Sequence, residues 1–218
     1  MKLNRLELIL DQEPSEVNWN MAIDEALLFT AELPTLRCYR WSRAAVSFGY
    51  FAKWEIVAAQ YPERQLVRRW TGGGVVEHGE DFTYSLVIPI AVDHPKTNDL
   101  YRFVHFGIAR ALRQGGQTVE IIGSPDKVEA VRCFDRAVES DLAANGKKIA
   151  GAAVRHHRRG VLLQGSIQRV TIPTTFGTML AETFTNQVTT RPLSVLTKEL
   201  ASRLANEKYG SEVWNRRF

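Results

Sequence analysis

Alternating apolar and polar positions predict a long strand over residues 82–90. The apolar set on one face of this strand is Phe82, Tyr84, Leu86, Ile88 and Ile90. A period of two places neighbouring side chains on opposite faces. Because Val87 makes the second face partly apolar, we expect the strand to be central and buried on both sides. Other β-rich runs predict shorter strands over residues 6–10, 36–41, 46–50, 118–122 and 160–167.

Apolar residues at helical spacing predict a helix between the first two strands. We expect it to begin after Ser15 as N-cap and to end before Pro34. Asp24 and Glu25 lie on or near the side opposite its apolar face, which consists of Trp19, Ala22, Ile23, Ala26 and Leu27.

A second long helix is predicted from Thr97 or Asn98 to the Gly115-Gly116 pair. His105 lies off its apolar stripe, so we expect a solvated surface histidine. Further helices are predicted over residues 53–61, 174–184 and 193–208. The economical interpretation is one α/β domain over residues 1–218, with a mixed sheet flanked by helices.

Asn145-Gly146 predicts a tight hairpin, because a type I′ turn needs positive φ at both central residues. A polar loop over residues 123–132 leads to Cys133 ahead of this hairpin. Alternation along the second strand places Lys148 on one face and Lys147 and Ile149 on the other. The pattern therefore leaves two interpretations open: a surface hairpin with solvated lysines, or a hairpin that directs one lysine into a site.

Three consecutive glycines, Gly72 to Gly74, lie between apolar segments. A backbone without side chains allows a ligand to lie directly against amide groups. The stretch lacks the Lys-Ser or Lys-Thr of a phosphate-binding P-loop and the spacing of the dinucleotide fingerprint. Arg68, Arg69 and His78 bracket it and favour a site for something polar or anionic over a plain turn.

Composition is that of an ordinary globular protein, with 44% hydrophobic and 24% charged residues among 218. No apolar run approaches the roughly 20 residues that a membrane span needs, and the N-terminus carries charge where a signal peptide would be apolar. Both observations predict a cytoplasmic protein. Cys38 and Cys133 are too few for a disulfide framework and lack zinc-site spacing, so each is expected to be a free thiol.

The net charge of +4 suits an acidic protein partner or nucleic acid. The basic run over residues 155–159 is short and has no interleaved aromatic residues, which argues against a nucleic-acid binder.

Four ordered motifs resemble the family of biotin and lipoate protein ligases and lipoyl/octanoyl transferases. They comprise Arg68-Arg69-x-Thr71-Gly72-Gly73-Gly74-x-Val76-x-His78, Thr83-Tyr84-Ser85, the segment from Gly146 to Ala153, and Gln164-Gly165-Ser166-Ile167. The helix around Asp24 and the C-terminal stretch from Lys208 to Asn215 are similar to the same family. The resemblance thus covers nearly the whole chain.

The resemblance implies a mixed, largely antiparallel sheet related to the catalytic domain of class II aminoacyl-tRNA synthetases and to biotin synthetase. It also implies that the glycine-rich loop lies along a lipoyl or octanoyl group in an apolar tunnel, and that Lys148 contacts the activated acyl carbonyl. The expected acyl- or cofactor-binding residues are Arg68, Arg69, Thr71, Gly72, Gly73, Gly74, His78, Asp141, Gly151, Ala152 and Gly165.

Cys133 distinguishes two activities within this family. Cys133-Phe134-Asp135 ahead of Lys148 resembles the octanoyltransferases, which move octanoate from acyl carrier protein to the glycine cleavage H protein or to lipoyl domains of 2-oxoacid dehydrogenases. Cys133 would then be the nucleophile, with no metal or cofactor beyond the transferred octanoyl or lipoyl group. Cys38, inside a predicted strand, is expected to be a small buried hydrophobe.

Ser140-Asp141-Leu142 is instead similar to the ATP-dependent lipoate ligases, whose acidic residue helps to hold ATP and magnesium. The glycine-rich loop fits both activities, and two-component ligases without an extra C-terminal domain on the same chain exist. The sequence therefore does not decide between a transferase and a ligase. It also does not decide whether octanoate or lipoate is the transferred group.

Overall fold

The computed structural model describes residues 1–123 and 140–218. Their largest element is an eight-stranded sheet with the order β11-β1-β2-β6-β10-β9-β8-β7. In it β1 pairs in parallel with β11 and β2, and the remaining pairs are antiparallel. The bounds are β1 Leu6–Leu10, β2 Thr35–Tyr39, β6 Phe82–Pro89, β7 Glu120–Ile121, β8 Leu142–Ala144, β9 Lys147–His157, β10 Gly160–Ile167 and β11 Val188–Thr190. The mixed, largely antiparallel sheet predicted from the sequence is confirmed.

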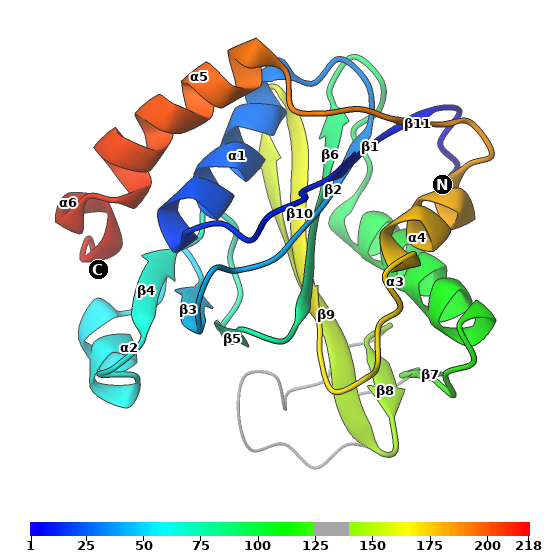
Figure 1. The fold of residues 1–218 in the computed structure, drawn as a ribbon, viewed down its shortest axis with the longest axis horizontal. Coiled ribbons are helices and arrows are strands. Elements are labelled where there is room, and N and C mark those ends of the chain that lie inside the picture. The colour runs from blue at the N-terminus through cyan, green and yellow to red at the C-terminus, as the bar shows by residue number, and fades with distance from the viewer. Residues whose placement is uncertain (124–139) are drawn as a thin grey trace.

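Figure 1 shows helices on both faces of this sheet. Helices α1 (Val17–Thr30) and α5 (Val195–Leu204) cover one face, and α3 (Thr97–Gln114) and α4 (Phe176–Phe184) cover the other. Strand β6 lies between β2 and β10, as expected for a central strand. Its Leu86 and Ile88 pack into the core on the α3 side, whereas Val87 packs into the core on the α1 side. The alternation along residues 82–90 thus supplies both cores.

A smaller sheet extends from one end of the molecule, in the order β4-β3-β5. It consists of β3 Ala45–Phe48, β4 Gln65–Arg68 and β5 Val75–His78, with α2 (Trp54–Gln60) between β3 and β4. The chain ends in a π-helical turn, Ala205–Tyr209, and in α6 (Glu212–Asn215). The loop between β4 and β5 holds the three glycines.

The predicted elements differ from the observed ones mainly at their ends. Helix α1 has Glu16 as N-cap instead of Ser15, because the backbone of Ser15 forms a bridge to Trp41. Helix α3 starts one residue earlier than expected, with Lys96 as N-cap, and the strand predicted over residues 118–122 is reduced to β7. The loop leading to Cys133 falls largely outside the described residues. The assignment of residues 1–218 to one domain stays a prediction.

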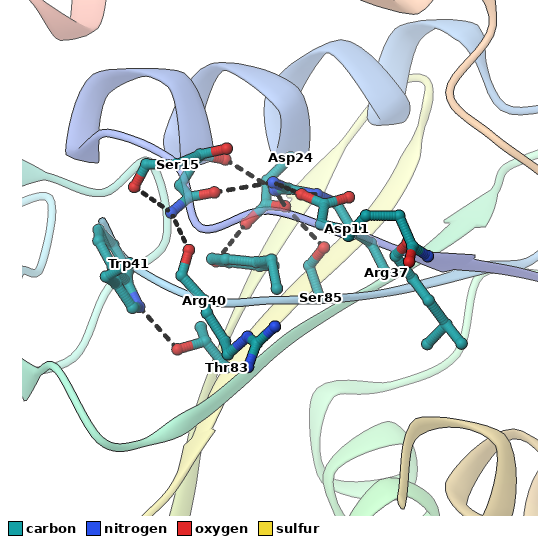
Figure 2. A network of polar contacts seen from close by, with 12 residues as sticks. Asp11, Ser15, Asp24, Arg37, Arg40, Trp41, Thr83 and Ser85 are labelled. Atoms are coloured by element: carbon teal, nitrogen blue, oxygen red, sulfur yellow. Dashed lines mark hydrogen bonds and ion pairs between the residues drawn. The ribbon is translucent and has the colours of Figure 1, made fainter. Parts of the chain in front are cut away.

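Buried charge joins α1 to the sheet. Figure 2 shows Asp24, fully buried on α1, facing Arg37 of β2, which is also fully buried. Arg37 Nη1 donates to Asp24 Oδ1 at 2.8 Å and to the carbonyl of Asn20 at 3.0 Å. Its Nε and Nη2 donate to Asp11 at 3.1 and 2.5 Å. Every nitrogen of the guanidinium is therefore bound, which is the condition under which a buried cation is tolerated.

The side of α1 that carries Asp24 and Glu25 is buried as well as its apolar face. Glu25 Oε2 accepts hydrogen bonds from Lys208 Nζ at 2.6 Å and from the Tyr209 hydroxyl at 2.5 Å. Helix α1 lies between the sheet and the C-terminal helices. Asp24 binds the sheet on one side of the helix, and Glu25 binds the C-terminal segment on the other.

We predict that Arg37→Met lowers the free energy of unfolding by about 3–5 kcal/mol, because it leaves the Asp24 carboxylate buried without its cation. Urea unfolding followed by circular dichroism measures the loss. Arg43→Met is the matched control, since Arg43 forms an exposed ion pair with Glu16 and such pairs contribute little. Equal effects of the two substitutions would contradict the role given to Arg37.

Candidate functional site

A cavity of about 260 Å³ lies between α1, the small sheet, the glycine loop and strands β9 and β10. Met21, Tyr39 and Trp41 form one wall, and Val75 and Val76 of β5 form another. Many of the residues expected from the sequence also line it, namely Arg69, Gly73, Gly74, His78, Lys148, Gly151, Ala152 and Gly165. The structure therefore brings together motifs that are far apart in the chain.

The polar side chains of the cavity wall are bonded to one another. Gln164 donates from Nε2 to Asp24 Oδ2 at 2.7 Å and accepts from Thr71 Oγ1 at 2.8 Å. Ser166 and Thr83 both donate to Asp81, at 2.7 and 2.8 Å. Because these polar atoms already have partners, the wall suits an apolar ligand.

Lys148 is directed into the protein by the hairpin. Asn145 and Gly146 have φ angles of 51° and 72° in the turn between β8 and β9, which confirms the predicted turn. Lys148 is 8% exposed, whereas the side chain of Lys147 is exposed to solvent. A Cβ at Gly151 would lie 3.0 Å from Lys148 Cε, so the lysine chain folds across a position that has no side chain. The interpretation of a plain surface hairpin is wrong.

Asp141 holds the Lys148 ammonium group. Its Oδ2 lies 2.7 Å from Lys148 Nζ, and its Oδ1 accepts a hydrogen bond from the Tyr101 hydroxyl. The carboxylate is fully buried. Burial and the negative charge of Asp141 raise the pKa of Tyr101, so this tyrosine stays a hydrogen-bond donor at neutral pH.

His105 corrects the sequence interpretation. We expected a solvated histidine, but the residue is fully buried between α3 and the segment that carries Asp141. Its Nδ1 lies 2.8 Å from the carbonyl oxygen of Ser140 and 3.9 Å from Asp141 Oδ1. Burial lowers the pKa of His105 to about 4. The apolar stripe did not reveal this, because the Ser140-Asp141 segment covers His105 on a second side of α3.

The glycine loop is held from inside the protein. A Cβ at Gly49 would lie 1.9 Å from the Gly73 carbonyl oxygen, so β3 and the loop approach backbone to backbone. Arg69 Nη2 donates to the carbonyls of Gly72 and Gly74 at 3.2 and 2.9 Å. The backbone of Gly73 and Gly74 consequently forms part of the cavity wall.

Arg68 lies outside the cavity. Its guanidinium donates to the main-chain carbonyls of Tyr50 and Ala52, each at 2.7 Å, and to that of Asn215 at 2.8 Å. Its own carbonyl accepts from Trp214 Nε1 at 3.0 Å. These contacts bind the C-terminal helix α6 to β4. Thr71 and Asp141 lie behind the cavity wall, where they bind Gln164 and Lys148, and Gly72 lines the adjoining groove.

A groove of about 680 Å³ adjoins the cavity. The two share Gly73, Tyr101, Ala152 and Ala153, so these residues mark the junction between them. The groove continues along the start of α3. Lys148 and the glycine loop therefore lie next to an open approach from the surface.

Of the two cysteines, Cys38 lies within the described residues. Cys38 is a buried free thiol in β2, as expected, and burial raises its pKa well above the ordinary value. Cys133 lies outside the described residues.

Within residues 1–123 and 140–218, no three His, Cys, Asp or Glu side chains gather as metal ligands would. No helix in the same ranges has both the length and the hydropathy of a membrane span.

Comparison with known proteins places the chain in a family. A model of the lipoyl protein ligase A/B catalytic domain matches residues 16–208. The chain belongs to that family. The resemblance drawn from the glycine-rich and Gly-Lys-Lys motifs is confirmed.

Several curated relatives of the chain are named octanoyltransferase LipM, and two of them illustrate the likeness. The protein from Oceanobacillus iheyensis is 39% identical over 172 residues, which cover 72% of this chain and 62% of the relative. The protein from Exiguobacterium sp. is 37% identical over 178 residues, which cover 73% of this chain and 64% of the relative. The match thus spans slightly less than two thirds of these relatives' length.

Solved structures of the family share the fold. A lipoate protein ligase from T. acidophilum, solved with bound lipoic acid, has a TM-score of 0.79 and 23% identity over 100% of both chains. A lipoate-protein ligase A solved with ATP has a TM-score of 0.78 and 22% identity over 99% of both chains. At these identities the likeness concerns the fold.

This lipoyl ligase-type domain also uses residues that sequence reasoning missed. Tyr101, Ser47, Asp81 and Gln164 contact the predicted site residues. Gln164 and Ser166 belong to the Gln164-Gly165-Ser166-Ile167 motif, but the motif itself indicated no role for their side chains. Tyr101 lies one helical turn before His105, so both side chains are on the same side of α3. The sequence could not show that this side faces Asp141.

We predict that His105 makes the domain sensitive to acid. The neutral ring is favoured in the fold, so its stability contribution is complete above pH 6.5 and is lost as the pH falls from there towards 4. The wild type should lose about 2 kcal/mol more than His105→Gln between pH 7.5 and pH 5, measured by urea unfolding. His94→Gln, at an exposed histidine, should keep the wild-type profile. A pH profile of His105→Gln identical to that of the wild type would refute this.

Proposed function

We propose that this domain transfers octanoyl groups in protein lipoylation, with acyl carrier protein as donor and a lysine of the glycine cleavage H protein or of a lipoyl domain as acceptor. Relatives named octanoyltransferase LipM support the reaction class. The observation on which the proposal mainly rests is Lys148, held by Asp141 at a narrow cavity whose wall is otherwise apolar or internally bonded. Octanoate is proposed as the transferred group and lipoate as its alternative.

The cavity suits a thin alkyl chain. Its volume of about 260 Å³ lies just below the range of about 300–1,000 Å³ usual for small-molecule pockets. Burying each methylene stabilises binding by about 0.8 kcal/mol, so six methylenes contribute roughly 5 kcal/mol. An octanoyl chain can therefore be bound through its tail, which leaves the carbonyl for the reaction.

The mechanism we propose uses Cys133 as nucleophile. Its thiolate attacks the thioester carbonyl of the donor, and the Lys148 ammonium, with backbone amides of the glycine loop, stabilises the oxyanion. Collapse breaks the donor C–S bond, releases the donor as its thiolate and leaves an octanoyl thioester on Cys133. The neutral amine of the acceptor lysine then attacks this thioester, an amide forms as the Cys133 thiolate leaves, and solvent takes the proton lost from nitrogen. Asp141 keeps Lys148 oriented through both steps.

The ATP-dependent ligase is the alternative reaction. In it Lys148 would bridge the acyl carbonyl and the phosphate of an acyl-adenylate. Its acidic residue would be Asp141, but the two oxygens of this carboxylate already bind Tyr101 and Lys148. A magnesium ion would have to displace one of them, so the donor set fits a metal poorly. The arrangement therefore favours the transferase.

We predict that incubation with octanoyl-acyl carrier protein adds one octanoyl group to Cys133, detected by mass spectrometry of the intact protein and its peptides. Cys133→Ala should show no adduct and no transfer. Cys38→Ala is the matched control and should be acylated as the wild type is, because Cys38 is buried and does not line the cavity. Lipoate- and ATP-dependent pyrophosphate exchange that persists in Cys133→Ala would select the ligase instead.

We also predict that Lys148→Ala lowers the transfer rate about 10²- to 10³-fold, the usual effect of removing one oxyanion donor. Lys147→Ala should leave the rate unchanged, because the neighbouring lysine faces solvent. Single-turnover transfer to a lipoyl domain measures both. Comparable losses in the two variants would indicate a general charge effect and contradict the role of Lys148.

A further inference from the structure

A second cluster of reactive groups lies on the cavity wall away from Lys148. Ser47 of β3 and His78 of β5 come together because these strands pair antiparallel, and Asp81 follows in the turn before β6. Ser47 Oγ lies 2.6 Å from His78 Nε2, and His78 Nδ1 lies 2.8 Å from Asp81 Oδ2. Nucleophile, base and orienting acid are thus each within hydrogen-bond distance of the next.

The proton positions follow from the partners. Burial alone would raise the pKa of Asp81, but its contact with His78 and hydrogen bonds from Ser166 and Thr83 keep this pKa below its ordinary value, so Asp81 is a carboxylate. A carboxylate only accepts, so His78 Nδ1 donates. In the neutral imidazole Nε2 is then an acceptor, and the Ser47 hydroxyl donates to it. This is the tautomer that a general base needs.

The base and the orienting acid are both held in place. The His78 ring stacks on Trp41, with centroids 4.0 Å apart and planes inclined by 19°. Asp81 also accepts from the amide of Gly79 at 3.1 Å through its other oxygen. The histidine therefore cannot turn away from Ser47 without breaking its contacts.

Positive charge lies beside the hydroxyl. Arg69 Nη1 donates to Ser47 Oγ at 2.7 Å, which favours an oxygen with developing negative charge. Ser47, His78 and Arg69 all line the cavity, next to the bare backbone of Gly73 and Gly74. A carbonyl group placed here would meet a nucleophile and donors together.

We propose that Ser47, with His78 and Asp81, forms a hydrolytic site for small activated acyl esters, separate from Cys133. Ser47 Oγ forms a bond to the acyl carbonyl carbon while its proton moves to His78 Nε2, and the alcohol leaves with that proton. Water then attacks the acyl-serine through the same base, which gives the carboxylate and restores Ser47.

Position explains the restriction to small acyl groups. Ser47 belongs to β3 of the small sheet, whereas Lys148 belongs to β9 of the large sheet, so the two residues line different walls of the cavity. An octanoyl chain with its carbonyl at Lys148 fills the cavity with its tail. An acetyl group is short enough to bring its carbonyl to the Ser47 wall.

The experiment uses p-nitrophenyl acetate and the Cys133→Ala variant, so that a thioester on Cys133 cannot contribute. We expect a burst of p-nitrophenolate and one acetyl group on the tryptic peptide of residues 44–53, which contains Ser47. Adding Ser47→Ala should abolish the adduct. Adding His78→Asn should slow acetylation at least about 100-fold, the usual contribution of a general base.

Ser42→Ala in the same background is the matched control. Ser42 is exposed, its hydroxyl donates to Glu16 and it does not line the cavity, so acetylation of Ser47 should persist. An unmodified peptide 44–53, or acetylation at an equal rate in His78→Asn, would overturn the proposal even if Ser47→Ala folds poorly. Because the test lacks Cys133, its failure is distinct from failure of octanoyl transfer.

Discussion

The buried carboxylate of Asp24 is the interaction on which both the fold and the candidate site depend. It accepts hydrogen bonds from Arg37, Tyr39, Ser85 and Gln164, at 2.7 to 2.9 Å. All four donors lie on strands β2, β6 and β10 of the large sheet, so one side chain of α1 joins these three strands. A buried charge is tolerated only with such complete pairing. The helix is therefore held in one position relative to the sheet.

The same carboxylate is connected to the glycine loop through hydrogen bonds. The Gln164 side chain forms hydrogen bonds with both Asp24 and Thr71, and Thr71 directly precedes Gly72. Arg69 binds the loop carbonyls on the other side, and the missing side chain of Gly49 allows the close approach of β3. The loop is thus positioned by contacts to the core, so its backbone can face a ligand without being supported by that ligand.

The cavity is apolar although many of its residues are polar. Gln164, Thr83 and Ser166 each direct their polar atoms to a buried carboxylate. Two acids, Asp24 and Asp81, therefore determine the character of the wall from behind it. Lys148 differs, because its own acid, Asp141, holds it beside the groove. The cavity wall therefore suits the acyl tail, whereas Lys148, beside the groove, is placed for the carbonyl group.

Local patterns in the sequence determined the strands, the helices, the Asn145-Gly146 turn and the inward face of Lys148, because each depends on residues close together in the chain. Motif order also indicated the family. The tertiary structure decided the rest. It buried His105 under the Ser140 segment, used Arg68 to bind α6, and brought Ser47 to His78 and Asp81. Those contacts join residues that are distant in sequence, and they depend on strand register and helix placement, which no local pattern contains.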